Sequence, residues 1–131
     1  MTWRSVVAAT AVAGASVLGS ACGGFDYDEA RDAVQRVGVE RMLQAADSLT
    51  ATTGSGRREL PAESWPQAFR DLRPEAIYVG ADGVELSMSS FYVEGENLFI
   101  AFRGATPPEE GGADPAVRKV AERIYWMHYT G

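Results

Sequence analysis

The sequence predicts an α+β domain in which N-terminal helices pack on an antiparallel β-meander of three or four strands. Apolar residues recur at helical spacing between Asp26 and Thr50, and apolar and polar residues alternate from Val84 to Ser89. Short turn signals such as Ala81-Asp82-Gly83 separate the later segments, as they do in a meander. A hydrophobic fraction of 46% in 131 residues is typical of a chain with one core, and we place that domain at 26–131.

Charge and residue counts exclude several classes of function. The chain has 18 Asp+Glu and 12 Lys+Arg, a net charge of −6, whereas nucleic-acid binding requires a basic surface. With one Cys and one His, it cannot form an internal disulfide, a Cys-x-x-Cys redox pair or a thiolate zinc site. We therefore expect no nucleic-acid partner, no metal site and no cofactor.

The first 22 residues have the pattern of a secretory signal. Arg4 and the amino terminus precede Ser5–Ala21, which carries no charge. This run of 17 residues is at the lower limit for crossing about 30 Å of hydrocarbon, and it is rich in Ala, Gly and Ser rather than Leu. A cleaved signal is therefore a better prediction than a permanent transmembrane helix.

The end of this run, Leu18-Gly19-Ser20-Ala21-Cys22, resembles the lipobox of bacterial lipoproteins. The resemblance implies that a diacylglycerol is linked to the Cys22 thiol and that a peptidase cuts between Ala21 and Cys22. Lipoboxes usually carry Leu three residues before the Cys, whereas this chain has Gly19 there and Leu18 one place earlier. The resemblance covers the leader only.

This reading divides the chain into a signal peptide (1–21), a lipidated Cys with a brief tether (22–25) and the folded domain. Two acyl chains, such as palmitate, hold a protein firmly on a membrane, whereas one holds it only marginally. The predicted location is the bacterial cell envelope, with the domain facing the periplasm or the exterior. The alternatives are release by ordinary signal peptidase, which accepts Gly19-Ser20-Ala21, an uncleaved anchor, and a plain buried thiol at Cys22.

Two short helices are predicted at about 27–37 and 39–50. The apolar residues of the first are Ala30, Ala33, Val34 and Val37, and those of the second are Val39, Met42, Leu43, Ala46 and Leu49. The apolar stripe moves to the opposite side across Gly38, a residue suited to a C-terminal cap or a kink. The alternative is one long helix that packs on both sides.

A polar loop and a third helix are predicted next. Residues 51–60 contain Gly and an Arg57-Arg58 pair that we expect to be solvated. Ser64 and Gln67 fit a capping box for a helix that runs through Phe69 and ends at Arg73-Pro74.

Three strands should follow in an antiparallel meander. They are predicted at Ile77–Val79, from Val84 onward, and at Leu98–Arg103, with turns at Ala81–Gly83 and Glu94–Asn97. A bulge near Ser89-Ser90 would return the aromatic and branched residues after it to the core side.

The C-terminal third is predicted to contain a loop, a short helix and a fourth strand. The loop covers 104–115 and is rich in Pro and Gly, and the helix covers about 116–121. Residues 123–129 are dense in aromatic and β-branched side chains, which favours a strand. A helix that continues to Met127 is the alternative.

No catalytic residues are predicted. His128 would need a partner such as Ser87, Ser89 or Ser90 for acyl transfer, and the sequence has no G-x-S-x-G motif to build one. The sequence also contains no pattern that would bring two carboxylates together for glycoside hydrolysis.

The aromatic residues instead favour a binding surface. Seven of them lie between Phe91 and Tyr129, more than one face of a meander needs for its core. The candidate binding residues are Tyr92, Trp126, His128 and Tyr129. The expected function is a non-enzymatic, lipid-anchored domain that binds a protein or an envelope polymer. A small envelope hydrolase using His128 and a soluble secreted inhibitor are the alternatives.

Overall fold

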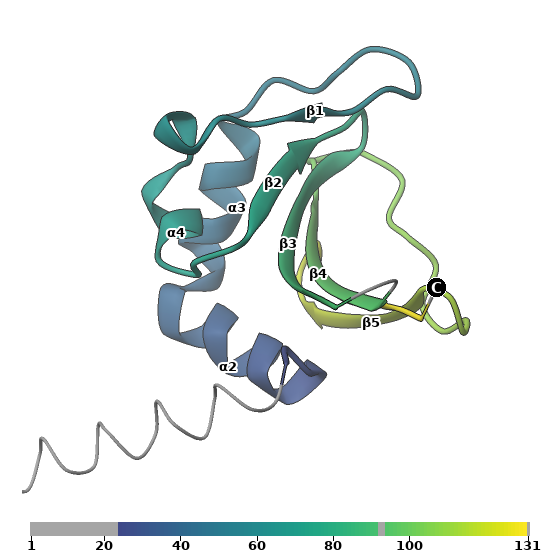
Figure 1. The fold of residues 1–131 in the computed structure, drawn as a ribbon. Helices are drawn as coiled ribbons and strands as arrows, with labels where there is room; N and C mark the ends of the chain where they lie inside the picture. The colour runs from purple at the N-terminus through teal and green to yellow at the C-terminus, as the bar shows by residue number, and fades with distance from the viewer. Residues whose placement is uncertain (1–23, 92–93, 131) are drawn as a thin grey trace, which may run out of the picture.

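The computed structural model describes residues 24–91 and 94–130. Over these residues, helices lie along one face of a six-stranded antiparallel sheet with strand order β1-β2-β3-β4-β6-β5 (Figure 1). The elements in chain order are α2 (Tyr27–Val37), α3 (Val39–Asp47), β1 (Arg58–Glu59), the 3-10 helix η1 (Ala62–Ser64), α4 (Gln67–Arg70), β2 (Ala76–Val79), β3 (Gly83–Phe91), β4 (Glu94–Ala101), β5 (Ala116–Ala121) and β6 (Ile124–Tyr129). The predictions for the leader, Cys22 and Tyr92 fall outside the described residues.

The α+β class is confirmed, but the predicted number of strands was wrong. Strands β2, β3 and β4 form the expected meander, whereas β5 and β6 form a hairpin whose second strand pairs with β4. Residues 116–121 are therefore a strand rather than the predicted helix. Val117 and Val120 suit both periodicities, and the backbone hydrogen bonds of this segment are made to β6. The predicted strand at the C-terminus is confirmed as β6.

The two N-terminal helices are confirmed, with a break at Gly38. This residue has φ 107°, a backbone conformation that residues with a side chain rarely adopt. It ends α2 directly before α3 begins. The Asp26 carboxylate accepts a hydrogen bond from the Glu29 N–H and caps α2. Helix α3 ends at Asp47, three residues before the predicted end.

The predicted capping box at Ser64 is wrong. Ser64 belongs to the 3-10 turn η1, and Pro66 immediately precedes the one-turn helix α4. Because a proline holds the residue before it in an extended conformation, Trp65 has ψ 128° and separates the two turns. The Gln67 amide donates forward to Asp71 instead of back to the cap.

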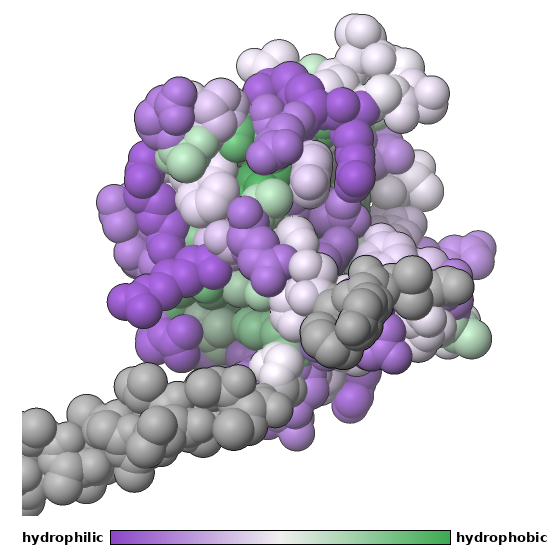
Figure 2. All heavy atoms as spheres, viewed as in Figure 1, coloured by the Kyte–Doolittle hydropathy of each residue, from purple (hydrophilic) through white to green (hydrophobic). Residues whose placement is uncertain are grey.

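The core lies between the helices and the sheet. Its largest fully buried side chains are Phe69, Met42, Ile77, Leu86, Leu98, Ile100 and Ile124. The β3 bulge falls between Ser87 and Ser89, slightly earlier than predicted. In the space-filling view, hydrophilic side chains cover most of the visible surface, and hydrophobic ones show only in small areas between them (Figure 2).

A charged pair joins α3 to the hairpin between β5 and β6. Both guanidinium NH groups of Arg123 lie 3.0 Å from the Asp47 carboxylate oxygens, and one of them also donates to the Ala101 carbonyl. Arg123 has φ 61°, so these contacts hold a backbone conformation that is unfavourable for a side-chain-bearing residue. The hydrogen bonds from Arg123 lower the pKa of Asp47 from its ordinary value of 3.8.

Replacing Asp47 with asparagine is expected to lower the free energy of unfolding by about 1 kcal/mol at pH 7. Because the pKa of Asp47 is lowered in the folded state, its stabilising effect is complete above pH of about 4 and is lost as the pH falls through the folded-state pKa. Urea unfolding of both proteins between pH 2 and 7 measures this difference. The exposed substitution Asp32→Asn is the control. A difference in unfolding free energy between the Asp47 variant and the unaltered protein that does not decrease in acid contradicts the prediction.

Candidate binding groove on the face opposite the helices

Two adjoining pockets lie on the sheet face that points away from the helices, which we call the helix-free face. Their volumes are about 430 Å³ and 380 Å³, within the range that a small ligand or a short peptide segment fills. They share Arg57, Tyr78 and Glu85 and so form one groove. The first pocket extends to Asp82, Gly83 and Phe99, and the second to Ser87, Glu94, Asn97 and Tyr129.

Strand alternation places the groove residues in one row. Tyr78 on β2 pairs with Glu85 on β3, and Glu85 pairs with Phe99 on β4. The chain neighbours of each of these residues are buried in the core, on the other side of the sheet. Because successive side chains in a strand point to opposite faces, the three groove residues must point away from the helices.

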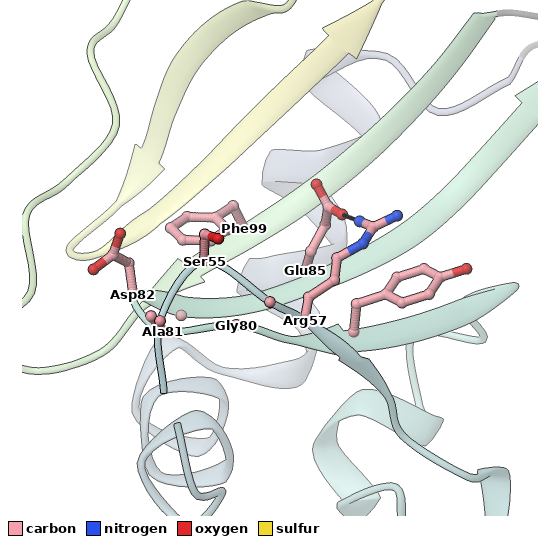
Figure 3. Close-up of a pocket in the computed structure, with 11 residues that line it drawn as sticks. Ser55, Arg57, Gly80, Ala81, Asp82, Glu85 and Phe99 are labelled. Atoms are coloured by element: carbon pink, nitrogen blue, oxygen red, sulfur yellow. Dashed lines mark hydrogen bonds and ion pairs between the residues drawn. The ribbon is translucent and has the colours of Figure 1, made fainter. Parts of the chain in front are cut away.

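One end of the groove depends on a glycine. A Cβ atom at Gly83 would lie 2.6 Å from Cζ of Phe99 and would collide with the Ile100 carbonyl oxygen. The Phe99 ring therefore covers the backbone of Gly83 and forms the wall of the first pocket. Figure 3 shows this ring beside Ser55 and Asp82.

Arg57 crosses the middle of the groove from the loop that precedes β1. Its guanidinium carbon lies 4.1 Å from the centre of the Tyr78 ring, a cation–π distance, and its NH1 group forms an ion pair with Glu85 (Figure 3). The other Glu85 oxygen accepts a hydrogen bond from the Tyr129 hydroxyl at 3.2 Å. Burial and the neighbouring Glu85 carboxylate raise the pKa of Tyr129 to about 12, so this hydroxyl stays protonated and donates at neutral pH.

The groove carries a negative balance of charge. Asp82 lines its first pocket, Glu94 lines its second, and Glu85 lies between them. Arg57 is the cationic side chain in the lining of both pockets, and Glu85 already pairs with it. The end of the groove at Asp82 is therefore acidic.

The predicted binding residues of β6 do not form a single patch. Tyr129 lies in the groove, whereas Trp126 and His128 point to the helix side of the sheet, as strand alternation requires. Trp126 stacks on His128 with ring centres 5.8 Å apart, and its indole N–H donates to the Phe25 carbonyl oxygen.

Phe25 is held from both sides by the sheet. Its N–H donates to one Glu96 carboxylate oxygen at 3.0 Å, while its carbonyl accepts from Trp126 at 2.9 Å. The other Glu96 oxygen lies 3.6 Å from Nδ1 of His128. Phe25, which the sequence placed in the tether, therefore packs against the domain core.

The geometry around His128 does not assemble a nucleophilic triad. Ser89, Glu96 and His128 lie opposite one another on β3, β4 and β6, so the carboxylate sits between the hydroxyl and the imidazole. Two strand spacings separate the Cα atoms of Ser89 and His128 by roughly 10 Å. A serine hydrolase needs the imidazole in the middle of this row.

The central residues of the groove were not among the predicted candidates. They are Arg57, Tyr78, Glu85 and Phe99. The polar side of β3, with Glu85 and Ser87, is the sequence signal that marks a face away from the core. No local pattern identifies Arg57, which was expected to be solvated, because its contact with Glu85 spans 28 residues.

The described residues contain no group of three His, Cys, Asp or Glu side chains that could hold a metal ion. No helix within residues 24–91 and 94–130 is long and apolar enough to cross a membrane.

Comparisons with known proteins do not identify a relative of this chain. No protein-family model matches it, and no curated protein or solved structure matches it either.

Proposed function

We propose that this chain is a lipid-anchored, non-enzymatic domain of the bacterial cell envelope that binds a partner through the groove on its helix-free face. One observation carries the anchor: an uncharged leader ends in small residues at Cys22, the single Cys of the chain. A diacylglyceryl group on this thiol would supply two acyl chains, enough for stable membrane attachment.

The position of Phe25 supports this proposal. Three residue steps separate Cys22 from Phe25, which packs against the core. A lipid on Cys22 would therefore lie just outside the domain, and no core contact of the described residues would have to break.

The groove supports binding rather than catalysis. Its polar residues contact one another, with Glu85 accepting hydrogen bonds from both Arg57 and Tyr129. The single His lies on the other face of the sheet, beside Glu96. The groove thus contains aromatic faces and charged groups, which recognise ligands, and does not contain the imidazole of the alternative hydrolase.

Replacing Cys22 with serine is expected to abolish lipid labelling of the chain. In bacteria that express the full chain and are fed radioactive palmitate, the unaltered protein should be labelled and should sediment with membranes. The variant should carry no label, because serine lacks the thiol that takes the lipid. Intact mass of the detergent-extracted protein gives the mass added to Cys22.

Ser20→Ala is the matched control, since it changes the same leader and keeps a small side chain before the cut. It should be labelled like the unaltered chain. An unlabelled, unaltered protein that is released into the medium contradicts the anchor proposal.

A further inference from the structure

We propose that the groove is a recognition site for an arginine side chain of a basic partner segment, and that Arg57 occupies this site in the free protein. This inference deepens the proposed binding function and rests on it for the existence of a partner. It goes further in naming the chemical group that is bound and the residue that competes with it.

The structure already contains a guanidinium group in a formed site. The Tyr78 ring supplies one flat face, 4.1 Å from the Arg57 guanidinium carbon, and Glu85 supplies the carboxylate. Tyr129 donates to the second Glu85 oxygen and so fixes the orientation of the carboxylate. An aromatic face combined with an oriented carboxylate is the arrangement that favours arginine over other side chains.

The two halves of this site differ in exposure. The Glu85 side chain is 18% exposed, whereas the Arg57 side chain is 59% exposed. The acceptor is thus built into the sheet, and its present occupant lies on the surface. Because the Arg57 side of this ion pair is solvent-exposed, an external guanidinium can reach Glu85 and compete for it.

The loop that carries Arg57 allows it to leave. Gly54 and Gly56 precede it, and a Cβ atom added at either glycine would meet nothing within 4 Å. The space beside these two glycines is therefore open. The exposed Arg57 side chain can rotate into it or into solvent without disturbing the core, while the Thr52 hydroxyl still holds the Gly56 carbonyl.

The charge at one end of the groove favours a basic partner. Asp82 lies at this end, beyond the Tyr78–Glu85 site. An extended basic segment could place an arginine at Glu85 and a further cation near the Asp82 carboxylate. This charge complementarity favours a basic peptide segment over a neutral polysaccharide.

The test uses the full chain in detergent and a blocked pentapeptide, Gly-Gly-Arg-Gly-Gly, titrated by NMR at low salt. Arg57→Gln is expected to bind the peptide about 3- to 10-fold more tightly than the unaltered chain, because the internal competitor is gone. Arg58→Gln is the matched control. It removes the same charge from the neighbouring residue, whose guanidinium donates to the Thr50 carbonyl instead, and it should leave the affinity unchanged within about twofold.

In the Arg57→Gln background, Glu85→Gln should weaken binding at least tenfold, with the urea midpoint measured to show that the protein is folded. Peptides with Gln in place of Arg should not bind. The proposal is overturned if Arg57→Gln and Arg58→Gln gain the same affinity for the peptide, or if Arg57→Gln binds it more weakly than the unaltered chain. It is also overturned if the Gln peptide or a neutral oligosaccharide binds at least as well as the Arg peptide. Palmitate labelling is independent of these titrations, so failure of the groove and failure of the anchor are distinguishable.

Discussion

Replacing Gly83 with alanine is expected to lower the free energy of unfolding by about 3 kcal/mol, a large share of the stability of a small domain. The added Cβ would overlap the Ile100 carbonyl oxygen and would lie 3.0 Å from the Ala101 Cα atom. Both atoms belong to the backbone of β4, so no side chain can rotate to make room. Strands β3 and β4 would have to separate at this end of the groove.

Urea unfolding followed by circular dichroism measures this change. Gly56→Ala is the matched control, because nothing lies within 4 Å of a Cβ added there, and its midpoint should stay close to that of the unaltered protein. The same alanine in two glycine positions thus isolates the steric effect. Equal midpoints for the Gly83 variant and the control would contradict the close approach of β4 to Gly83.

Replacing Phe69 with alanine is expected to cost about 3–5 kcal/mol of unfolding free energy. Phe69 is fully buried, and α4, which carries it, is only one turn long and cannot be stable by itself. Removing the ring would leave a cavity between α4 and the core. It would also remove the largest buried side chain of this turn.

Thermal and urea unfolding both measure the loss for Phe69. Glu63→Ala, an exposed substitution in the adjacent turn η1, is the control and should change stability by less than about 0.5 kcal/mol. The free energy of unfolding of Phe69→Leu should fall between those of Phe69→Ala and the control, because leucine keeps most of the apolar volume. A Phe69→Ala protein as stable as the control would show that the ring does not fill the core.

The N-terminal half shows what periodicity can predict. The change of stripe at Gly38 was sufficient to predict two helices and the break between them, because each stripe has to face the core. Helix α4 was harder, since Pro66 divides a segment whose Ser64 and Gln67 resemble a capping box.

The sheet shows where local patterns fail. Residues 116–121 are compatible with helix and strand alike, and pairing with β6 decides between them. The groove depends even more on distant contacts, because Arg57 and Glu85 come together only when β1, β2 and β3 are adjacent. Strand alternation alone predicts that Trp126 and Tyr129 lie on opposite faces, and this would have divided the predicted aromatic patch.

The contacts that hold Phe25 would determine how the proposed anchor orients the domain on a bilayer. If a lipid is attached to Cys22, a segment of at most about 11 Å would connect it to the end of the sheet where Glu96 holds Phe25. The second pocket, which reaches Gly95 beside Glu96, would then be the part of the groove nearer to the lipid, and Asp82 at the other end would lie farther from it. The lipid would thus lie near one end of the groove, and the Asp82 end would remain available to a partner.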